Sequence, residues 1–445
     1  MKYYIIAGEA SGDLHGSNLM RGLYEEDPAA EIRFWGGGMM NGVYRSHNSA
    51  DGLPGAEAAA AAEGSSAAAA AEGSNAAAAA EGSNAAAEAE AEGSGAAAGR
   101  GCGLVKDYGE GAVMGVADVL AKAGRLLGNL RFCKEDILRW KPDAVILIDY
   151  PGFNMKIAKF AHKAGFKVFY YIAPKTWASR EGRNRKLRQW VDRLFIVFPF
   201  EIPYFESKAI PFTYVGNPLI DAIDGSTAMS ESREDFLNRH SLADRPFIAL
   251  LAGSRKSEVR RTLSKQLEMA DRLHETARYR EHIFLVAGAP SRSESDYLDE
   301  IGKRDYVRLI FDDSYGILRN SESAVINSGT ASLEAALIGT PQVVVWSTSG
   351  FNAFIGKYIL RVLDHIRFIS LGNLIADRLV FPELIQDDFT VENICAETRA
   401  LNEHAEYREA MLRGYDEIRS ALGGAGASRK VAKAMIDCCS EGRQA

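Results

Sequence analysis

Short apolar runs that alternate with amphipathic stretches place the strongest constraint on how this chain can fold. The runs are KYYIIAG, DAVILID, KVFYYIA and RLFIVFP in the first half, and PFIALLAGS, IFLVAG, SAVINSG and QVVVWS in the second. Runs of this length, rich in Val, Ile and Phe and separated by helical patterns, are typical of parallel strands buried on both faces. The sequence therefore predicts an α/β protein with two doubly wound, Rossmann-like units.

A polar segment at 215–235, VGNPLIDAIDGSTAMSESRED, separates the two sets of runs. We expect a first domain over 1–222 and a second over 223–445, with the last helix as a candidate for packing back on the first domain. Ligands of doubly wound units bind at the carboxyl ends of the strands. The expected ligand site is thus a cleft between the two units.

An alanine-rich segment interrupts the first domain. Within 57–98, alanine blocks are punctuated by EGS at 63–65, 72–74 and 81–83. The repeated glycines each cost about 1 kcal/mol in a helix interior, and the segment has no large apolar side chain to bury. We expect residues 42–100 to be a disordered low-complexity insertion, with a repeat module for a partner as the alternative.

Composition excludes several classes of protein. A formal net charge of −7 gives no general attraction to nucleic acid, and none is expected as a partner. No run approaches the about 18 apolar residues of a spanning helix, and the N-terminal run is too short for a signal peptide. The cysteines have neither metal-ligand spacing nor the density of a disulfide scaffold, which indicates a reducing compartment. They are Cys102, Cys133, Cys395, Cys438 and Cys439.

The first candidate site follows the first strand, in IIAGEASGDLHGS at 5–17. The loop lacks the G-x-G-x-x-G of a dinucleotide fold, because Glu9 stands between Gly8 and Gly12. A tight turn would explain the glycines but not a carboxylate at this place. Two interpretations stay open: Glu9 contacts a sugar or takes part in catalysis, or it caps the helix together with Ser11 and Asp13.

Asp149 is the second candidate. It ends the apolar run AVILI, and Pro151-Gly152 turn the chain out of the strand, so the carboxylate is expected at the strand tip. Partial desolvation there would raise its pKa toward that of a general base. The alternative is an Asx-type turn cap.

Two loops in the second half suit a nucleoside diphosphate. Gly253, Ser254 and Arg255 lead from a strand into a helix, whose N-terminal N–H groups and arginine suit phosphate oxygens. A second helix start follows at 328–334. It contributes Ser328, Gly329 and Thr330, with Glu334 one turn further on the same face as an acceptor for ribose hydroxyls.

The segment PKTWASREGRNRKLRQW, 174–190, combines cations with aromatic residues, as in proteins that bind anionic headgroups. A solvated helix face is the equally weighted alternative. The residues in question are Lys175, Trp177, Arg180, Arg183, Arg185, Lys186 and Arg188.

Ten blocks, in chain order, resemble the lipid-A-disaccharide synthase family. They are AGEASGD, WGGGMM, VMG, IDYPGFN, YYIAPKTWA, FPFE, YVGNP, GSRKSEV, SGTASLE and ISLGNLIADRLVFPELIQ. The resemblance covers nearly the whole chain except 42–100 and the extreme C-terminus. It implies the two-Rossmann GT-B glycosyltransferase architecture and a cytoplasmic enzyme, peripheral on the inner membrane of Gram-negative bacteria.

The same resemblance implies a reaction. The enzyme would transfer 2,3-diacylglucosamine from UDP-2,3-diacylglucosamine to the 6-hydroxyl of 2,3-diacylglucosamine 1-phosphate, forming a β-1,6 bond and releasing UDP. The first domain would then be the acceptor and membrane side, and the second would bind the UDP-sugar. The anionic membrane surface is an expected partner, and a homo-oligomer stays open.

Matched by motif, the family's functional positions correspond to Glu9, Asp149, Arg255 and, for UDP or phosphate binding, Asn373. The chain departs from the family pattern where prolines are common, with Ala252 and Gly372 instead. It also has Asn217 where histidine is frequent, so no proton transfer is assigned there.

The expected mechanism is an inverting displacement. Asp149 removes the acceptor proton, and Glu9 orients the sugar. Arg255 and the helix starts at 254 and 328 neutralise the leaving diphosphate, so no metal or other cofactor is expected. Two alternatives stay open: a UDP-N-acetylglucosamine 2-epimerase-like enzyme, and a non-catalytic nucleotide-sugar-binding protein.

Overall fold

The chain forms two compact α/β units, which confirms the predicted fold class. The computed structural model describes residues 1–49, 102–107, 118–177, 181–347 and 367–441. The first unit comprises Met1–Val197, Glu201–Pro218 and Gly426–Ala445, and the second comprises Phe198–Phe200 and Leu219–Ala425. Each unit is described by itself below.

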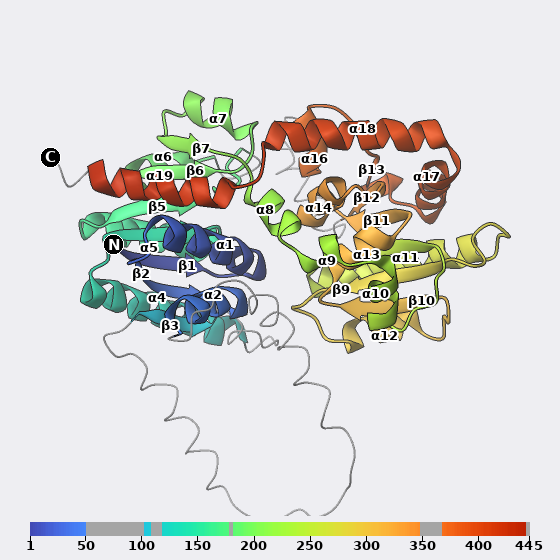
Figure 1. Ribbon diagram of the computed structural model, residues 1–445, viewed down its shortest axis with the longest axis horizontal. Helices are drawn as coiled ribbons and strands as arrows, with labels where there is room; N and C mark the ends of the chain where they lie inside the picture. The colour runs from blue at the N-terminus through green and yellow to red at the C-terminus, as the bar shows by residue number, and fades with distance from the viewer. Residues whose placement is uncertain (50–101, 108–117, 178–180, 348–366, 442–445) are drawn as a thin grey trace, which may run out of the picture. The chain divides into compact units, whose positions relative to one another are not determined.

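A seven-stranded parallel sheet with the order β3-β2-β1-β4-β5-β6-β7 forms the centre of the first unit (Figure 1). Its strands are β1 Lys2–Ala7, β2 Glu31–Gly36, β3 Gly103–Asp107, β4 Ala144–Ile148, β5 Lys167–Tyr171, β6 Arg193–Ile196 and β7 Phe212–Tyr214. Its helices are α1 Ala10–Glu26, α2 Gly38–Asn48, α4 Asp118–Trp140, α5 Pro151–Lys163, α6 Arg183–Trp190, α7 Glu201–Ser207 and α19 Ala427–Glu441.

The second unit has a six-stranded parallel sheet with the order β10-β9-β8-β11-β12-β13. Its strands are β8 Phe247–Leu251, β9 Ile283–Gly288, β10 Val307–Phe311, β11 Ser323–Asn327, β12 Gln342–Trp346 and β13 Glu383–Ile385. Its helical elements, with α8 starting at the boundary between the units, are α8 Pro218–Asp224, α9 Thr227–Ser230, α10 Arg233–Arg239, α11 Lys256–His274, α12 Ser295–Ile301, α13 Ser314–Asn320, α14 Thr330–Ile338, α16 Leu371–Ala376, η3 Gln386–Asp388, α17 Val391–Glu403 and α18 Ala405–Leu422.

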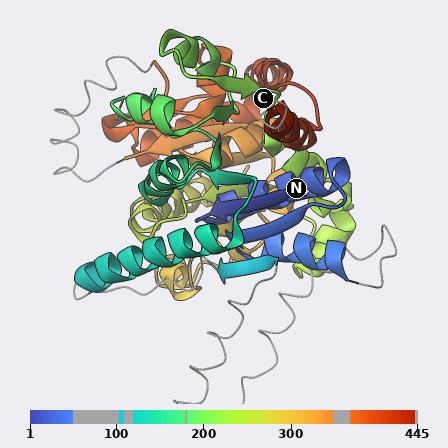
Figure 2. The ribbon, with the colours of Figure 1, turned by 90° about the vertical axis from the view of Figure 1, so that its left-hand side faces the viewer.

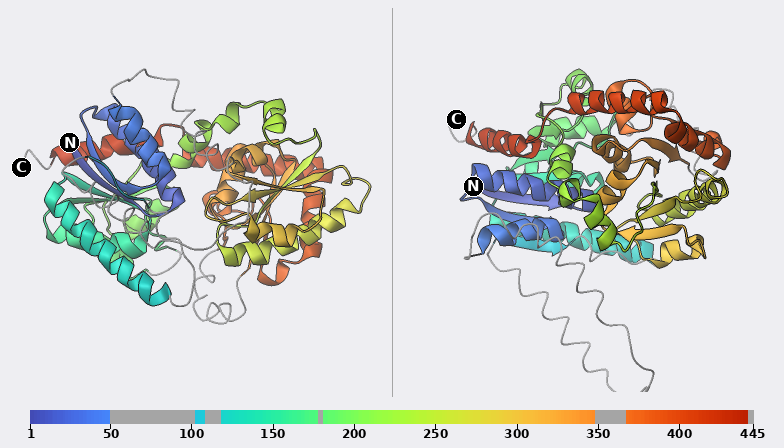
Figure 3. Two further views of the ribbon diagram at one scale, coloured as in Figure 1. Left: turned by 90° about the horizontal axis from the view of Figure 1, so that it is seen from below. Right: turned by 45° about the vertical axis from the view of Figure 1, so that its right-hand side comes forward.

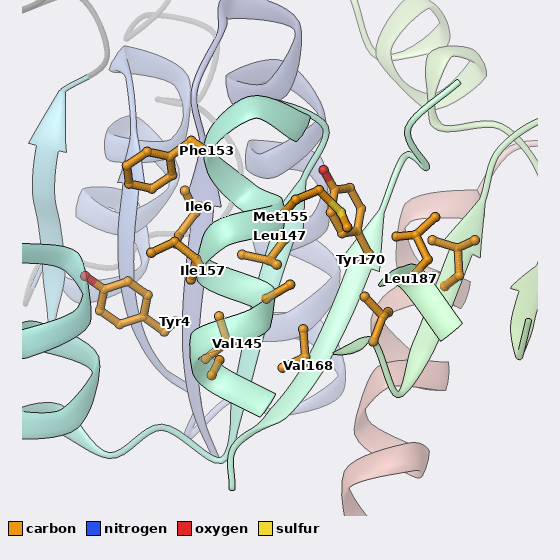
Figure 4. Close-up of a cluster of buried hydrophobic side chains, with 14 of the residues drawn as sticks. Tyr4, Ile6, Val145, Leu147, Phe153, Met155, Ile157, Val168, Tyr170 and Leu187 are labelled. Atoms are coloured by element: carbon orange, nitrogen blue, oxygen red, sulfur yellow. The ribbon is translucent and has the colours of Figure 1, made fainter. Parts of the chain in front are cut away.

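Burial on both faces explains why the central strands are apolar throughout. All five residues of β4 are fully buried. Because strand side chains alternate between faces, Val145 and Leu147 point to one side, where they belong to the same buried cluster as Phe153 and Ile157 of α5 (Figure 4). The hydrophobic pattern thus sets the position of the strand ends, which is what the functional site depends on.

Helix α19 returns from the C-terminal end of the chain to pack against α1, and the two helices lie side by side in Figures 1 and 3. Gly22 permits the close approach, because a Cβ atom there would lie 2.9 Å from the Cα atom of Arg429. Arg429 also pairs with Glu26 of α1.

Residues 42–48, which the sequence analysis counted with the alanine-rich insertion, belong to helix α2. The N-terminus of this helix is held by Asp13, whose carboxylate accepts hydrogen bonds from the N–H groups of Gly37, Met39 and Met40 at 2.8, 3.0 and 3.1 Å. The remaining part of the predicted insertion, from residue 50 on, lies outside the described residues.

A buried ionic network attaches α4, the long teal helix in Figure 2, to the first sheet. Asp136 of α4 accepts two hydrogen bonds from the Arg33 guanidinium and one from the Tyr4 hydroxyl, each at 2.8 Å. Trp35 donates its indole N–H to the same hydroxyl at 2.9 Å. The side chains of Arg33 and Asp136 are only 6% and 3% exposed, so removing one partner leaves the other charge buried.

We predict that Asp136→Asn lowers the free energy of unfolding by about 3–5 kcal/mol, because the Arg33 charge would lose its counterion away from water. Urea unfolding followed by circular dichroism measures the change. Glu135→Gln is the matched control, since its neighbouring pair with Arg131 is exposed and its loss should leave stability nearly unchanged. Equal effects of the two substitutions would contradict the prediction.

Candidate functional site

The strand order of the first sheet reverses between β1 and β4. These strands are neighbours, with Ala7 opposite Ile148, while β2 lies beyond β1 and β5 lies beyond β4. The chain therefore leaves β1 and β4 in opposite directions, and their carboxyl ends form the kind of switch point at which doubly wound proteins bind ligands. Glu9 follows β1 and Asp149 follows β4, so the two carboxylates predicted from sequence stand at this switch point.

Glu9 occupies the N-cap position of α1, but its side chain makes no capping hydrogen bond, and it is exposed. Asp13, its expected partner in capping, instead holds the start of α2. The capping interpretation thus does not describe the Glu9 carboxylate. The Glu9 side chain lies just after the end of β1 and makes no hydrogen bond to the N-terminus of α1.

The chain turns sharply at the end of β4. Asp149 and Tyr150 both have left-handed backbone conformations, with φ values of 42° and 45°, before α5 begins at Pro151. Non-glycine residues in this region cost on the order of 1–3 kcal/mol each, and they persist where the surrounding structure enforces them. Gly8 makes room for the turn, because a Cβ atom there would lie 2.3 Å from the Tyr150 ring.

The environment of Asp149 suits proton transfer. Burial is the main cause that raises the pKa of this carboxyl above its usual value, and the negative charge of Glu9 raises it further. The Lys175 ammonium and a hydrogen bond from the N–H of Tyr150 act in the opposite direction on this pKa. Burial and neighbouring charges thus shift the pKa of Asp149 in opposite directions, with the upward shift the larger.

The second sheet reverses between β8 and β11 in the same way, with Leu251 opposite Ile326. Gly253, just after β8, has a φ of 105°, and a Cβ atom there would lie 2.9 Å from the Asn327 amide nitrogen at the end of β11. Both the conformation and the close approach require glycine. The structure therefore brings together the two loops that the sequence analysis assigned to a nucleoside diphosphate.

Arg255 is the N-cap residue of α11, and its side chain is 75% exposed. Its guanidinium pairs with Glu258 one turn on, at 2.7 Å, and the second oxygen of Glu258 accepts from the N–H groups of Ser254 and Arg255 at 3.3 Å. Glu258 therefore occupies the donors that the sequence analysis offered to phosphate. Sequence reasoning missed this residue, although it lies in the GSRKSEV block.

The start of α14 has no side-chain cap, and its N-cap residue Gly329 lies between Ser328 and Thr330. Further along, burial raises the pKa of Glu334 to about 7, while a hydrogen bond from Tyr315 acts to lower it. Tyr315 belongs to α13, next to α14. In its ionised form, this carboxyl group can accept hydrogen bonds from paired hydroxyls.

Asn373 lies in a different setting from the other candidates, because it is fully buried in α16. Its amide N–H₂ donates to the Phe381 carbonyl and to Glu383 at 3.0 and 2.8 Å, and its oxygen accepts from the N–H of Val380 at 2.8 Å. Glu383 in turn accepts from the N–H groups of Ile369 and Ser370. These bonds hold the start of α16 against the segment that follows it.

The basic segment 174–190 divides into two parts. Lys175 is close enough to Asp149 to influence its pKa, and Trp177 donates to the buried Glu201 at 3.2 Å. Helix α6 buries Leu187 and leaves Arg183 partly exposed. Its outer face carries Arg185, Lys186 and Arg188. Arg180 lies outside the described residues.

No helix among the described residues combines the length and the apolar character needed to span a membrane. In the same part of the chain, no group of three or more His, Cys, Asp and Glu side chains is arranged to hold a metal ion.

Relatives of known name match along nearly the entire chain. The chain is 33% identical over 434 residues to the lipid-A-disaccharide synthase of Geobacter metallireducens, which covers 97% of this chain and 96% of that protein. It is 34% identical over 430 residues to the lipid-A-disaccharide synthase of Syntrophus aciditrophicus, covering 96% and 95%. The match to the enzyme of Myxococcus xanthus is 35% over 352 residues, 79% of this chain and 90% of that one.

Solved structures resemble the chain in fold alone. The UDP-GlcNAc 2-epimerase from Neisseria meningitidis aligns with a TM-score of 0.62 at 13% identity, covering 98% of this chain and all of that one. The spinosyn rhamnosyltransferase SpnG aligns with a TM-score of 0.51 at 12% identity, again over 98% of this chain and all of the other. The expected GT-B architecture is confirmed by this similarity.

The family model for lipid-A-disaccharide synthetase matches residues 71–433. Together with the identities to the named relatives over nearly full length, this match establishes that the chain belongs to the lipid-A-disaccharide synthase family.

Proposed function

We propose that the protein transfers 2,3-diacylglucosamine from UDP-2,3-diacylglucosamine to the 6-hydroxyl of 2,3-diacylglucosamine 1-phosphate, with release of UDP. Family membership supports the reaction class, and the juxtaposition of Asp149 and Glu9 at the first switch point is the observation that carries the mechanism. The first unit then acts on the acceptor. The second unit binds the nucleotide.

In the proposed reaction, the ionised Asp149 carboxylate takes the proton of the acceptor hydroxyl as its oxygen attacks the anomeric carbon. A new C–O bond forms on the face opposite the nucleotide, and the bond between the anomeric carbon and the phosphate oxygen breaks. The electron pair of that bond leaves with UDP. Because the attack comes from the opposite face, the anomeric configuration inverts. Glu9 accepts hydrogen bonds from the sugar and orients it.

Negative charge accumulates on the departing diphosphate. We assign its neutralisation to Arg255 and to the N–H groups at the starts of α11 and α14, with the diphosphate replacing Glu258 as the partner of Arg255 and of the α11 N–H groups. A helix N-terminus carries a partial positive charge. Glu334 accepts hydrogen bonds from the ribose. Asn373 contributes by ordering the start of α16, because its own polar groups are all used within the protein.

We predict that the purified protein forms a disaccharide and UDP, detected by mass spectrometry, and that EDTA leaves the rate unchanged. Asp149→Asn should lower kcat by about 10²–10⁴-fold without changing the Kd for UDP. Arg255→Ala should weaken UDP binding, whereas Arg261→Ala on the same helix serves as the matched control. Full turnover of Asp149→Asn would exclude Asp149 as the base.

The pH dependence tests the electrostatics of the site. The base must be ionised, so the acid limb of kcat/KM follows the pKa of Asp149, which burial and Glu9 raise and Lys175 lowers. Glu9→Gln should therefore move the acid limb to lower pH, and Lys175→Met should move it to higher pH. Shifts in the same direction for both variants would contradict this assignment.

Membrane association is proposed for the outer face of α6. Its three exposed cations would attract anionic headgroups, each contributing on the order of 1 kcal/mol. Replacing Arg185, Lys186 and Arg188 by Gln should reduce sedimentation with vesicles that contain phosphatidylglycerol and leave binding to neutral vesicles unchanged. The matched control replaces three exposed cations elsewhere, Arg399, Arg413 and Lys430. Equal losses of sedimentation in the two triple variants would show that α6 has no specific role in membrane binding.

An epimerase-like activity is the alternative that the fold permits. Incubation with UDP-N-acetylglucosamine distinguishes the epimerase from the proposed transferase, because an epimerase would form UDP-N-acetylmannosamine without an acceptor. Release of the epimer, with no disaccharide from the acylated substrates, would overturn the proposed function.

A further inference from the structure

We infer that Asn154 and Tyr170 are positioning residues for Asp149: they hold its carbonyl oxygen and thereby fix the left-handed turn from which its carboxylate acts. This inference rests on the proposed role of Asp149 as the base. Neither residue was a candidate from the sequence, because an asparagine inside a helix and a tyrosine inside a buried strand are ordinary core residues.

The first step is the fate of the Asp149 carbonyl. Because the chain leaves β4 in a left-handed conformation, this oxygen cannot continue the ladder of the sheet, and a half-buried carbonyl needs other donors. The Tyr170 hydroxyl donates to it at 2.6 Å, and the Asn154 amide donates to it at 2.9 Å. Two side chains thus converge on one backbone oxygen.

The second step is the independence of the two donors. Asn154 comes from α5, beyond the turn, and also donates to the Ile148 carbonyl at 3.1 Å. Tyr170 comes from β5, where it stands opposite Leu147. The turn is therefore held from two sides, by a side chain in the first turn of its own helix and by one from the neighbouring strand.

The third step concerns the amide oxygen of Asn154. Its side chain is fully buried, and its amide oxygen has no hydrogen-bond partner among the described residues. An unpaired buried acceptor lowers the stability of the folded state. An apolar side chain would avoid this loss if the position served only for packing. The amide nitrogen of this residue donates instead to the carbonyl oxygens of Asp149, Ile148 and Ile6 at 2.9, 3.1 and 3.5 Å, of which the Asp149 bond is the shortest.

Tyr4 supplies a matched control for Tyr170. Both are fully buried tyrosines of the same sheet and core cluster, and Figure 4 shows them in different parts of that cluster. Each hydroxyl is hydrogen-bonded, Tyr4 to Asp136 and Tyr170 to the Asp149 carbonyl. Loss of either hydroxyl removes buried hydrogen bonds, and Tyr4 should lose at least as much stability, since its hydroxyl also accepts from Trp35. Only the Tyr170 hydroxyl contacts the proposed base.

The experiment compares Tyr170→Phe with Tyr4→Phe in the full chain. We expect Tyr170→Phe to lower kcat at least about tenfold, since small displacements of a reacting group are costly, with the KM for the donor and the Kd for UDP unchanged. Tyr4→Phe should leave kcat unchanged with at least as large a loss of stability. Asn154→Ser should repeat the kinetic effect of Tyr170→Phe. Equal kcat values for the two Phe variants would overturn the inference.

A double-mutant cycle separates positioning from a general structural effect. In the Asp149→Asn background, Tyr170→Phe should change the residual rate by less than about twofold, because the group that it positions is already disabled. Independent, multiplicative losses would contradict the inference. If Asp149→Asn itself retained full turnover, the proposed function of Asp149 would fail instead, so the two failures are distinguishable.

Discussion

Parallel pairing of β1 with β4 is the constraint on which the candidate site of the first unit depends. Because Ala7 stands opposite Ile148, the residues that follow these strands emerge side by side, and two carboxylates from positions 140 residues apart in sequence meet. Glu9 then raises the proton affinity of Asp149 in a setting that burial has already made unfavourable for charge. The second unit repeats the reversal of strand order between β8 and β11, where the loop at Gly253 approaches Asn327.

The two switch points differ in how their functional groups are held. At the end of β4 the backbone itself is forced into an unfavourable conformation, and buried side chains from the core keep it there. Before α11, glycine at position 253 allows the left-handed backbone conformation without strain. Arg255 and the neighbouring N–H groups are held there by the carboxylate of Glu258. Rigid packing thus fixes the proposed base, whereas an exposed, exchangeable ion pair holds the proposed phosphate ligand.

The sequence predicted the fold and the strand ends well, because hydrophobic runs and the residues that end them are local features. It also predicted that loops 253–255 and 328–330 belong together, since both follow parallel strands. The surroundings of each residue depend on distant segments and were missed. Asn373 donates to Glu383 and Phe381, and the charge of Lys175 lowers the pKa of Asp149. Neither interaction has a signature in composition or periodicity.

The packing of α19 on α1 has a consequence for biosynthesis. The N-terminal sheet is the first to leave the ribosome, yet the face of α1 around Gly22 is covered only when residues 427–441 have been translated. Helix α19 follows the whole second unit in the sequence, so the first unit begins before the second and receives its last helix after it.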